Sequence, residues 1–188
     1  SAFYGCSNLT GSFTDAPNLT NVTSLYLTFT GAINFNGDVS SWNTSNVTNM
    51  FGTFYLASSF NKPLNSWDVS NVTIMSGMFR GASTFNQDIN NWDVSNVTNM
   101  DRLFQSTNFN KPLNNWDVTS VTNFLTFASG VTFSTSNYDA ILIGWEQTLQ
   151  ATFPNGSGYT PNITISFGSS QYTGGGAAAA ARASLVSN

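Results

Sequence analysis

A nine-residue motif recurs four times along the chain at an almost constant spacing. The copies WNTSNVTNM, WDVSNVTIM, WDVSNVTNM and WDVTSVTNF begin at Trp42, Trp67, Trp92 and Trp116, which lie 25, 25 and 24 residues apart. A Phe-Asn pair precedes each tryptophan by seven residues, and a weaker copy comes first with Pro17 in the tryptophan position. A fixed period of about 20–29 residues is typical of stacked supersecondary units. We therefore predict a tandem-repeat solenoid of about five coils over residues 1–133, the first of them degenerate.

Within one copy, the apolar residues predict two kinds of secondary structure. Trp92 and Val94 alternate with polar Asp93, which favours a short strand. Met75, Met78 and Phe79 follow the i, i+3, i+4 spacing of one or two helical turns. The fold class predicted is an α/β solenoid with one short strand and one short helix per repeat, as in leucine-rich repeats, with Phe, Trp and Met replacing much of the Leu. We expect the four repeated tryptophans to fill the core.

The repeat stops after Phe133, and residues 134–188 are predicted to form a small α+β cap packed on the solenoid as one domain. An open end of a coil stack would template aggregation, so a cap is expected there. Ser136 or Asn137 is a plausible N-cap for the first helix. Alanine, the best helix former, dominates the second. The predicted elements are a helix at 136–150, a strand at 162–167 and a helix at 174–186.

Composition excludes several classes of function. Five basic residues and a net charge of −4 cannot neutralise a nucleic-acid backbone, and no apolar run approaches the roughly 20 residues of a membrane span. The chain contains no histidine and one cysteine, Cys6, so the commonest general base is absent and neither an internal disulfide nor a thiolate metal cluster can form. With 40% hydrophobic residues the chain is expected to fold. We expect no enzymatic activity and no cofactor.

The repeat FNQDINNWDVSNVTNM resembles that of the BspA-like leucine-rich-repeat surface proteins, which carry a W-D-V-S-N-V-T-x-M signature. The opening FYGCSNL is similar to the related F-x-G-C-x-x-L motif of treponemal-type repeats, and NYDAILIGW, QYT and AAAAARASL resemble a recurrent ending of the family. The resemblance implies a right-handed solenoid on a bacterial cell surface that works in adhesion or protein binding. The abrupt beginning and end of the chain lead us to expect a fragment of a larger modular protein.

Three aspartates share one position of the repeat, with Asn43 as the neutral member. Stacking would place their carboxylates in one column, about 4.8 Å apart. Carboxylate and amide oxygens are ligands that calcium prefers. One Asp per coil, however, supplies few of the ligands that a calcium site needs. Asp also accepts backbone N–H bonds in turns. We favour the turn interpretation and predict no metal site, with calcium as the alternative. The residues concerned are Asp68, Asp93 and Asp117.

Ligand contacts are expected at positions whose residue type varies between copies, because there the scaffold does not dictate the side chain. We hypothesise a non-enzymatic, extracellular adhesion or recognition domain that binds a protein, peptide or glycan through a solenoid face. The alternative is a structural spacer or stalk module of a larger surface protein or fibre, in contact with that protein's other modules. The candidate binding residues form two columns, one of Lys62, Gln87 and Lys111 and the other of Tyr55, Arg80 and Gln105.

Overall fold

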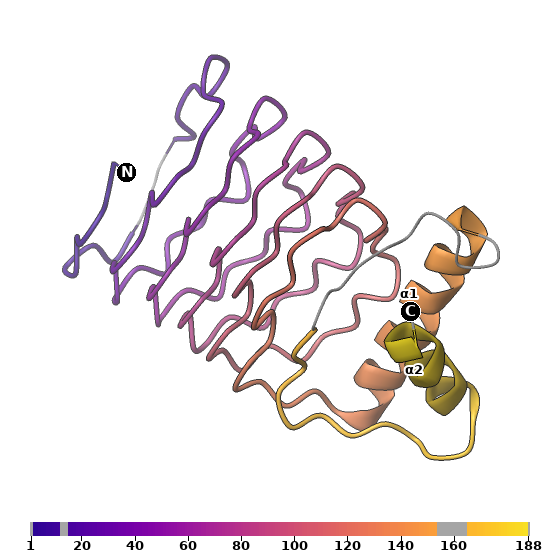
Figure 1. Ribbon diagram of the computed structural model, residues 1–188. Helices are drawn as coiled ribbons and strands as arrows, with labels where there is room; N and C mark the ends of the chain where they lie inside the picture. The colour runs from indigo at the N-terminus through magenta and orange to yellow at the C-terminus, as the bar shows by residue number, and fades with distance from the viewer. Residues whose placement is uncertain (1, 12–14, 154–164, 188) are drawn as a thin grey trace.

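The repeats form a stack of irregular coils with two helices at its C-terminal end (Figure 1). The computed structural model describes residues 2–11, 15–153 and 165–187. Helix α1 spans Thr135–Thr152 and helix α2 spans Ala177–Ser187. Neighbouring copies meet at isolated parallel β-bridges, and the described residues contain no named strand. These bridges join Ser24 to Asn49, Asn49 to Ile74, Ile74 to Asn99 and Asn99 to Asn123.

The predicted α/β solenoid with one strand and one helix per repeat is wrong. Only one residue of each copy forms a β-bridge, and the apolar segment that follows it forms consecutive turns. An α-helix requires each backbone N–H to bond the carbonyl four residues earlier. Here Met78 N–H bonds Met75 O, three residues back, while Gly77 N–H bonds Asp101 O of the next coil. Gly77 also has a positive φ of 61°, which a right-handed helix does not allow.

Alternate backbone N–H groups of the turn segment therefore tie each coil to the next. From Met75 onwards, the N–H groups of residues 75, 77, 79 and 81 donate to the carbonyls of residues 99, 101, 103 and 105, at 2.8–3.1 Å. The same ladder joins residues 25–31 to 49–55, 50–56 to 74–80 and 100–106 to 123–129. A single coil has no such partners, which is why the copies are stable only as a stack.

The core consists of columns of aromatic rings that run along the stack. Phe29, Phe54, Phe79 and Phe104 form one column, and the phenylalanines of the Phe-Asn pairs form a second, with rings nearly parallel from coil to coil. Inside one coil the two columns meet at 3.8–4.1 Å between centroids. The repeated tryptophans are at most 6% exposed. Their predicted core position is confirmed.

The asparagines of the Phe-Asn pairs form a ladder of hydrogen bonds beside the second column. The Oδ1 of Asn61 accepts the backbone N–H of Asn86, and the Oδ1 of Asn86 accepts that of Asn110. At the end of the ladder, Asn110 Oδ1 accepts the N–H of Ser134 and also the side-chain amide of Asn137. Ser134, not Ser136 or Asn137, is thus the N-cap of α1, with its hydroxyl accepting from Asn137 N–H.

Helix α1 covers the last coil with a tryptophan that continues the tryptophan column. The indole N–H of Trp92 donates to Leu64 O and that of Trp116 donates to Ile89 O, each in the preceding coil. Trp145 of α1 makes the equivalent bond to Leu113 O at 2.8 Å. The helix therefore occupies the place of a further coil.

The predicted α+β nature of the cap is also wrong. Residues 165–167 form no strand, and residues 162–164 of the predicted strand lie outside the described residues. The segment instead contributes the Ser166 carbonyl, which accepts the N–H of Ala128, and the Phe167 ring, which packs on Trp145. Both predicted helices are present.

Burial raises the pKa of Tyr138 on α1, and Arg182 of α2 opposes that shift.

Candidate functional site

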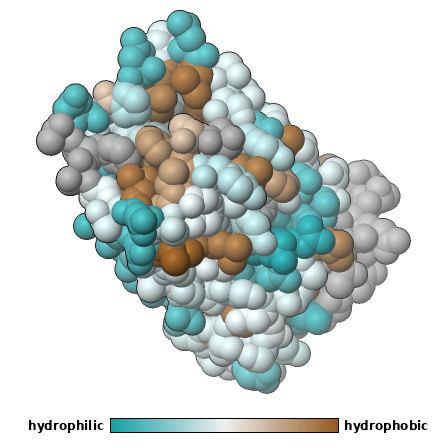
Figure 2. Space-filling view, turned by 90° about the vertical axis from the view of Figure 1, so that its left-hand side faces the viewer, coloured by the Kyte–Doolittle hydropathy of each residue, from teal (hydrophilic) through white to brown (hydrophobic). Residues whose placement is uncertain are grey.

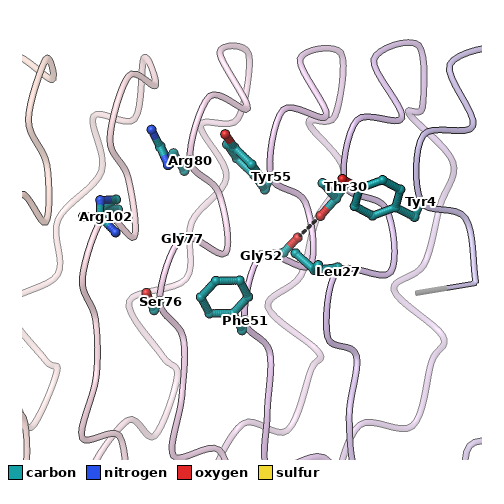
Figure 3. Close-up of a pocket in the computed structure, with 10 residues that line it drawn as sticks. All are labelled: Tyr4, Leu27, Thr30, Phe51, Gly52, Tyr55, Ser76, Gly77, Arg80 and Arg102. Carbon is teal, nitrogen blue, oxygen red and sulfur yellow. Dashed lines mark hydrogen bonds between the residues drawn. The ribbon is translucent and has the colours of Figure 1, made fainter.

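A hollow on the turn segments brings aromatic and guanidinium groups of several coils together (Figure 3). It encloses about 220 Å³. Three columns of equivalent positions surround it, one residue per coil, and Figure 3 shows them as roughly parallel rows. The row above contains Thr30, Tyr55 and Arg80, the middle row contains Leu27, Gly52, Gly77 and Arg102, and the row below contains Phe51 and Ser76. Tyr4 lies beside Thr30 at the N-terminal end.

The lower row is a column of exposed rings that stops at Ser76. Tyr26 and Phe51 stack at 5.2 Å between centroids with an angle of 18°, and they are 46% and 36% exposed. The next position is Ser76, whose side chain is too short to continue the stack. The ring column therefore ends at Phe51, and no ring follows it in the next coil.

The middle row forms the floor, and its side chains cover it unevenly. A Cβ on Gly52 would lie 2.5 Å from Leu27 Cδ2, so Leu27 already covers the Gly52 backbone. Gly52 has no side chain with which to cover Gly77 in the same way. The nearest heavy atom to a Cβ on Gly77 would be Arg80 Cβ at 3.9 Å. Gly77, beside the end of the ring column, therefore has no side chain over it as Gly52 has, although Gly77 and Ser76 are themselves buried.

Two arginines lie at the edge of this floor, and their guanidinium groups have different partners. The Arg80 guanidinium lies 5.1 Å from the Tyr55 ring centroid, a cation–π contact. Arg102 is paired with the carboxylate of Asp101 at 2.8 Å. Within the described part of the chain, no carboxylate forms an ion pair with Arg80. Arg80 thus offers the uncompensated positive charge at the hollow.

The structure separates the two predicted columns. Tyr55 and Arg80 line the hollow, whereas Gln105 of the same column does not, and its half-buried side chain has an Oε1 atom without a hydrogen-bond partner among the described residues. Gln87 lies on a different, polar depression with Asn90 and Asn115.

The other predicted column is partly engaged in holding the coils together. The side-chain amide of Gln87 donates to both the backbone carbonyl and Oδ1 of Asn61. Lys62 is half-buried, and its charge contributes to lowering the pKa of Asp38, after the larger effects of the Ser40 hydrogen bonds. Lys111 is likewise half-buried. Of this column, Gln87 is held by hydrogen bonds between the coils, whereas Lys62 and Lys111 are half-buried like Tyr55 and Arg80.

The aspartate column makes the turn contacts that we favoured. Oδ1 of Asp68 accepts the hydroxyl of Ser70 at 2.7 Å and its backbone N–H at 3.0 Å. Asp93 and Asp117 bond the residues two positions later in the same way. Asn43 makes the same two bonds through its amide oxygen, so the turn requires an acceptor and not a charge. Over the described residues, no group of three or more metal-binding side chains comes together.

Asp68 gives the turn a pH dependence. The hydroxyl and then the backbone N–H of Ser70 hold the pKa of Asp68 below its model-compound value of 3.8. Its contribution to stability is therefore complete above that value and is lost as the pH falls through the lower folded-state pKa. We expect Asp68→Asn, which keeps the acceptor as Asn43 does, to flatten the fall in stability below pH 3.8. Urea denaturation of both proteins across this range measures the effect, and parallel curves would contradict it.

The residues around Gly77 that sequence reasoning missed are Tyr4, Tyr26, Phe51, Ser76 and Arg102. A usable signal was present. The position two residues after each bridging residue carries Tyr26, Phe51, Ser76, Asp101 and Leu125 in successive copies. Such variety is the criterion that selected the Tyr55–Arg80 column, and it selects this column too.

Comparison with known proteins finds one family. A family model described as "Mycoplasma protein of unknown function, DUF285" matches residues 1–107 and again residues 65–141. The two matches overlap over residues 65–107, which a tandem repeat explains because it fits the same pattern in more than one register. No curated protein and no solved structure matches the chain. No helix in the described part of the chain is both long and apolar enough to cross a membrane.

Proposed function

Because the chain belongs to the DUF285 family, whose function is unknown, we propose its role from its surface: a non-enzymatic recognition domain of a cell-surface protein that binds an extracellular ligand. The binding surface proposed is the hollow around Gly77 with the ring column of Tyr26 and Phe51. The resemblance to BspA-like surface proteins supports the extracellular location.

The observation that carries this proposal is the exposure of aromatic side chains where the scaffold does not require them. Tyr4, Tyr26 and Phe51 are 59%, 46% and 36% exposed, while the rings of the core columns are fully enclosed. Contiguous exposed apolar patches often mark interaction sites. Tyr and Arg are enriched among the residues that contribute most to binding energy. Figure 2, which looks onto the N-terminal end of the stack, shows apolar patches between hydrophilic side chains.

The residues present give no support to a catalytic role. The chain contains no histidine, and the hollow contains no carboxylate among its lining residues. General acid–base chemistry requires a group that titrates near the operating pH within reach of the substrate. Recognition needs only a fixed arrangement of rings and charge, which the stack of coils provides.

Binding of the purified domain to an array of host-matrix proteins, peptides and glycans tests the proposal, in calcium and again in EDTA. We expect at least one saturable ligand whose affinity falls in Arg80→Gln and not in Lys111→Gln. These two variants remove the same charge from the hollow and from the other predicted column, so they separate local contact from net charge. Folded protein that binds nothing on the array would contradict recognition and favour the spacer alternative. Loss of binding in EDTA would point to the aspartate column.

A further inference from the structure

We infer that the hollow above Gly77 is a socket for one aromatic side chain of a partner protein, with a carboxylate next to that side chain in the partner's peptide segment. The inference deepens the proposed function and rests on it. It follows from two neighbouring gaps in otherwise regular columns, together with the charge beside them.

The first gap is in the ring column. Tyr26 and Phe51 stack along the coils at 5.2 Å, and Ser76 occupies the position at which a third ring would lie. The position is compatible with a ring, because Phe51 occupies the same place one coil earlier and its side chain points outward from the stack, 36% exposed. A partner's ring placed beside Phe51 at this position would extend the column.

The second gap is in the floor beneath this place. Leu27 fills the space over Gly52, but nothing lies within 3.9 Å of a Cβ on Gly77. Both glycines have positive φ, 58° and 61°, a conformation that side chains with a Cβ rarely adopt. The same position carries a side chain at positive φ in Leu27 and Arg102, 52° and 56°, so it is the choice of glycine at 52 and 77 that leaves this part of the floor without a side chain.

The size of the hollow limits what it can hold. Its volume of about 220 Å³ is below the roughly 300–1,000 Å³ of sites that enclose whole small molecules. It suits one side chain inserted from a larger partner, which is also how anchor residues contribute most of the binding energy at protein interfaces. Phe51 and Ser76 lie side by side below Tyr55 and Arg80, and all four line the hollow (Figure 3). A flat ring fits this hollow better than a hydroxyl-bearing sugar, since the walls are mostly apolar.

The charge of Arg80 determines which residue we expect next to the inserted aromatic residue in the partner's sequence. Arg102 is neutralised by Asp101, whereas Arg80 stacks on Tyr55 without a carboxylate partner among the described residues. Tyr55 holds the Arg80 guanidinium at the rim of the hollow. A carboxylate close in sequence to the inserted aromatic residue would reach it, and hydrogen bonds between charged groups are stronger than those between neutral ones.

The test uses fluorescently labelled nine-residue peptides of Gly and Ser that carry one Phe and one Glu at separations of zero to three residues. Matched peptides replace Phe by Ala or Glu by Gln. We expect saturable binding of at least one Phe/Glu peptide, with affinity at least about tenfold lower when either residue is replaced. Equal binding of the Ala/Glu peptides, or binding of anionic glycans but of no Phe/Glu peptide, would overturn the inference.

Two variants place the binding in the socket. Ser76→Phe extends the ring column of the chain itself and fills the gap, so it should abolish peptide binding while the melting temperature stays equal or rises. Arg80→Gln should lower affinity about tenfold for the Phe/Glu peptide and leave the Phe/Gln peptide unchanged. Undiminished binding by a folded Ser76→Phe protein would overturn the socket. If the Ser76→Phe protein still binds its ligands on the array, recognition stands but the socket is wrong. If the parent protein binds no ligand on the array, the recognition proposal itself is contradicted.

Discussion

Trp92→Ala is expected to destabilise the protein by at least about 4 kcal/mol. Truncating a fully buried Trp leaves a cavity that costs about 3–5 kcal/mol. It also removes the indole N–H that donates to Leu64 O at 2.9 Å. Leu64 O still accepts the backbone N–H of Trp67, so the loss of this hydrogen bond adds about 0.5–1.5 kcal/mol. The stability of a typical domain is only about 5–15 kcal/mol. The variant should therefore unfold at markedly lower urea concentration.

Two further variants separate the contributions to this loss. Trp92→Phe keeps a ring in the column but loses the indole donor, so it should retain more of the stability than Trp92→Ala does. Leu125→Ala removes a side chain that is 52% exposed and should change the free energy of unfolding by less than about 0.5 kcal/mol. If Trp92→Ala were as stable as Leu125→Ala, the tryptophan column would not be part of the core.

Gly144→Ala is expected to release α1 from the last coil, although alanine is the better helix former by about 1 kcal/mol. A Cβ at Gly144 would overlap the carbonyl oxygen of Asn114 and lie 2.8 Å from its Cα and Cβ. The obstacle is backbone, so it cannot rotate away. Overpacking of this kind costs about 1–3 kcal/mol or more. We expect a net loss of about 2 kcal/mol, together with a red shift of tryptophan fluorescence as Trp145 becomes exposed.

Gly174→Ala is the matched control for this second prediction. A Cβ at Gly174 would meet no atom within 4 Å, and Gly174 is not among the residues with positive φ. Its stability and fluorescence should equal those of the parent protein. A stable Gly144→Ala with unchanged fluorescence would show that α1 does not lie against Asn114 as described.

The core was predictable from the sequence because the period assigns each apolar residue to a column. Whatever the coil's secondary structure, Trp42, Trp67, Trp92 and Trp116 must occupy equivalent positions, and a large aromatic residue repeated in every coil is most stable inside. The Phe-Asn asparagines and the aspartates were predictable for a similar reason, since their side chains satisfy turn N–H groups in each copy.

The secondary structure of the coil was not predictable from the same pattern. The i, i+3, i+4 spacing of Met75, Met78 and Phe79 fits a helical turn, but it equally fits consecutive turns that close on carbonyls three residues back. What decides between them is the use of alternate N–H groups by the next coil, a contact between residues 23–25 positions apart. Gly77, in the middle of the segment, was the local indication against a helix.

The candidate site was predictable in part. Variation between copies identified Tyr55 and Arg80, but the hollow is defined by residues that are absent as much as by those present. The lack of a ring at Ser76 and of a side chain at Gly52 has meaning only once Leu27, Phe51 and Gly77 are seen side by side. The place of Trp145 in the tryptophan column was equally hidden, because it follows Trp116 by 29 residues and belongs to a helix.

The most direct test of recognition through the hollow is a titration of the isotope-labelled domain with its tightest-binding Phe/Glu peptide, followed by NMR. We predict that the largest shifts of backbone amide signals occur at Ser76, Gly77 and Arg80 and that they saturate. The largest shifts at Lys62, Gln87 and Lys111 instead would contradict the account, because they would place the binding surface on the other column of the stack.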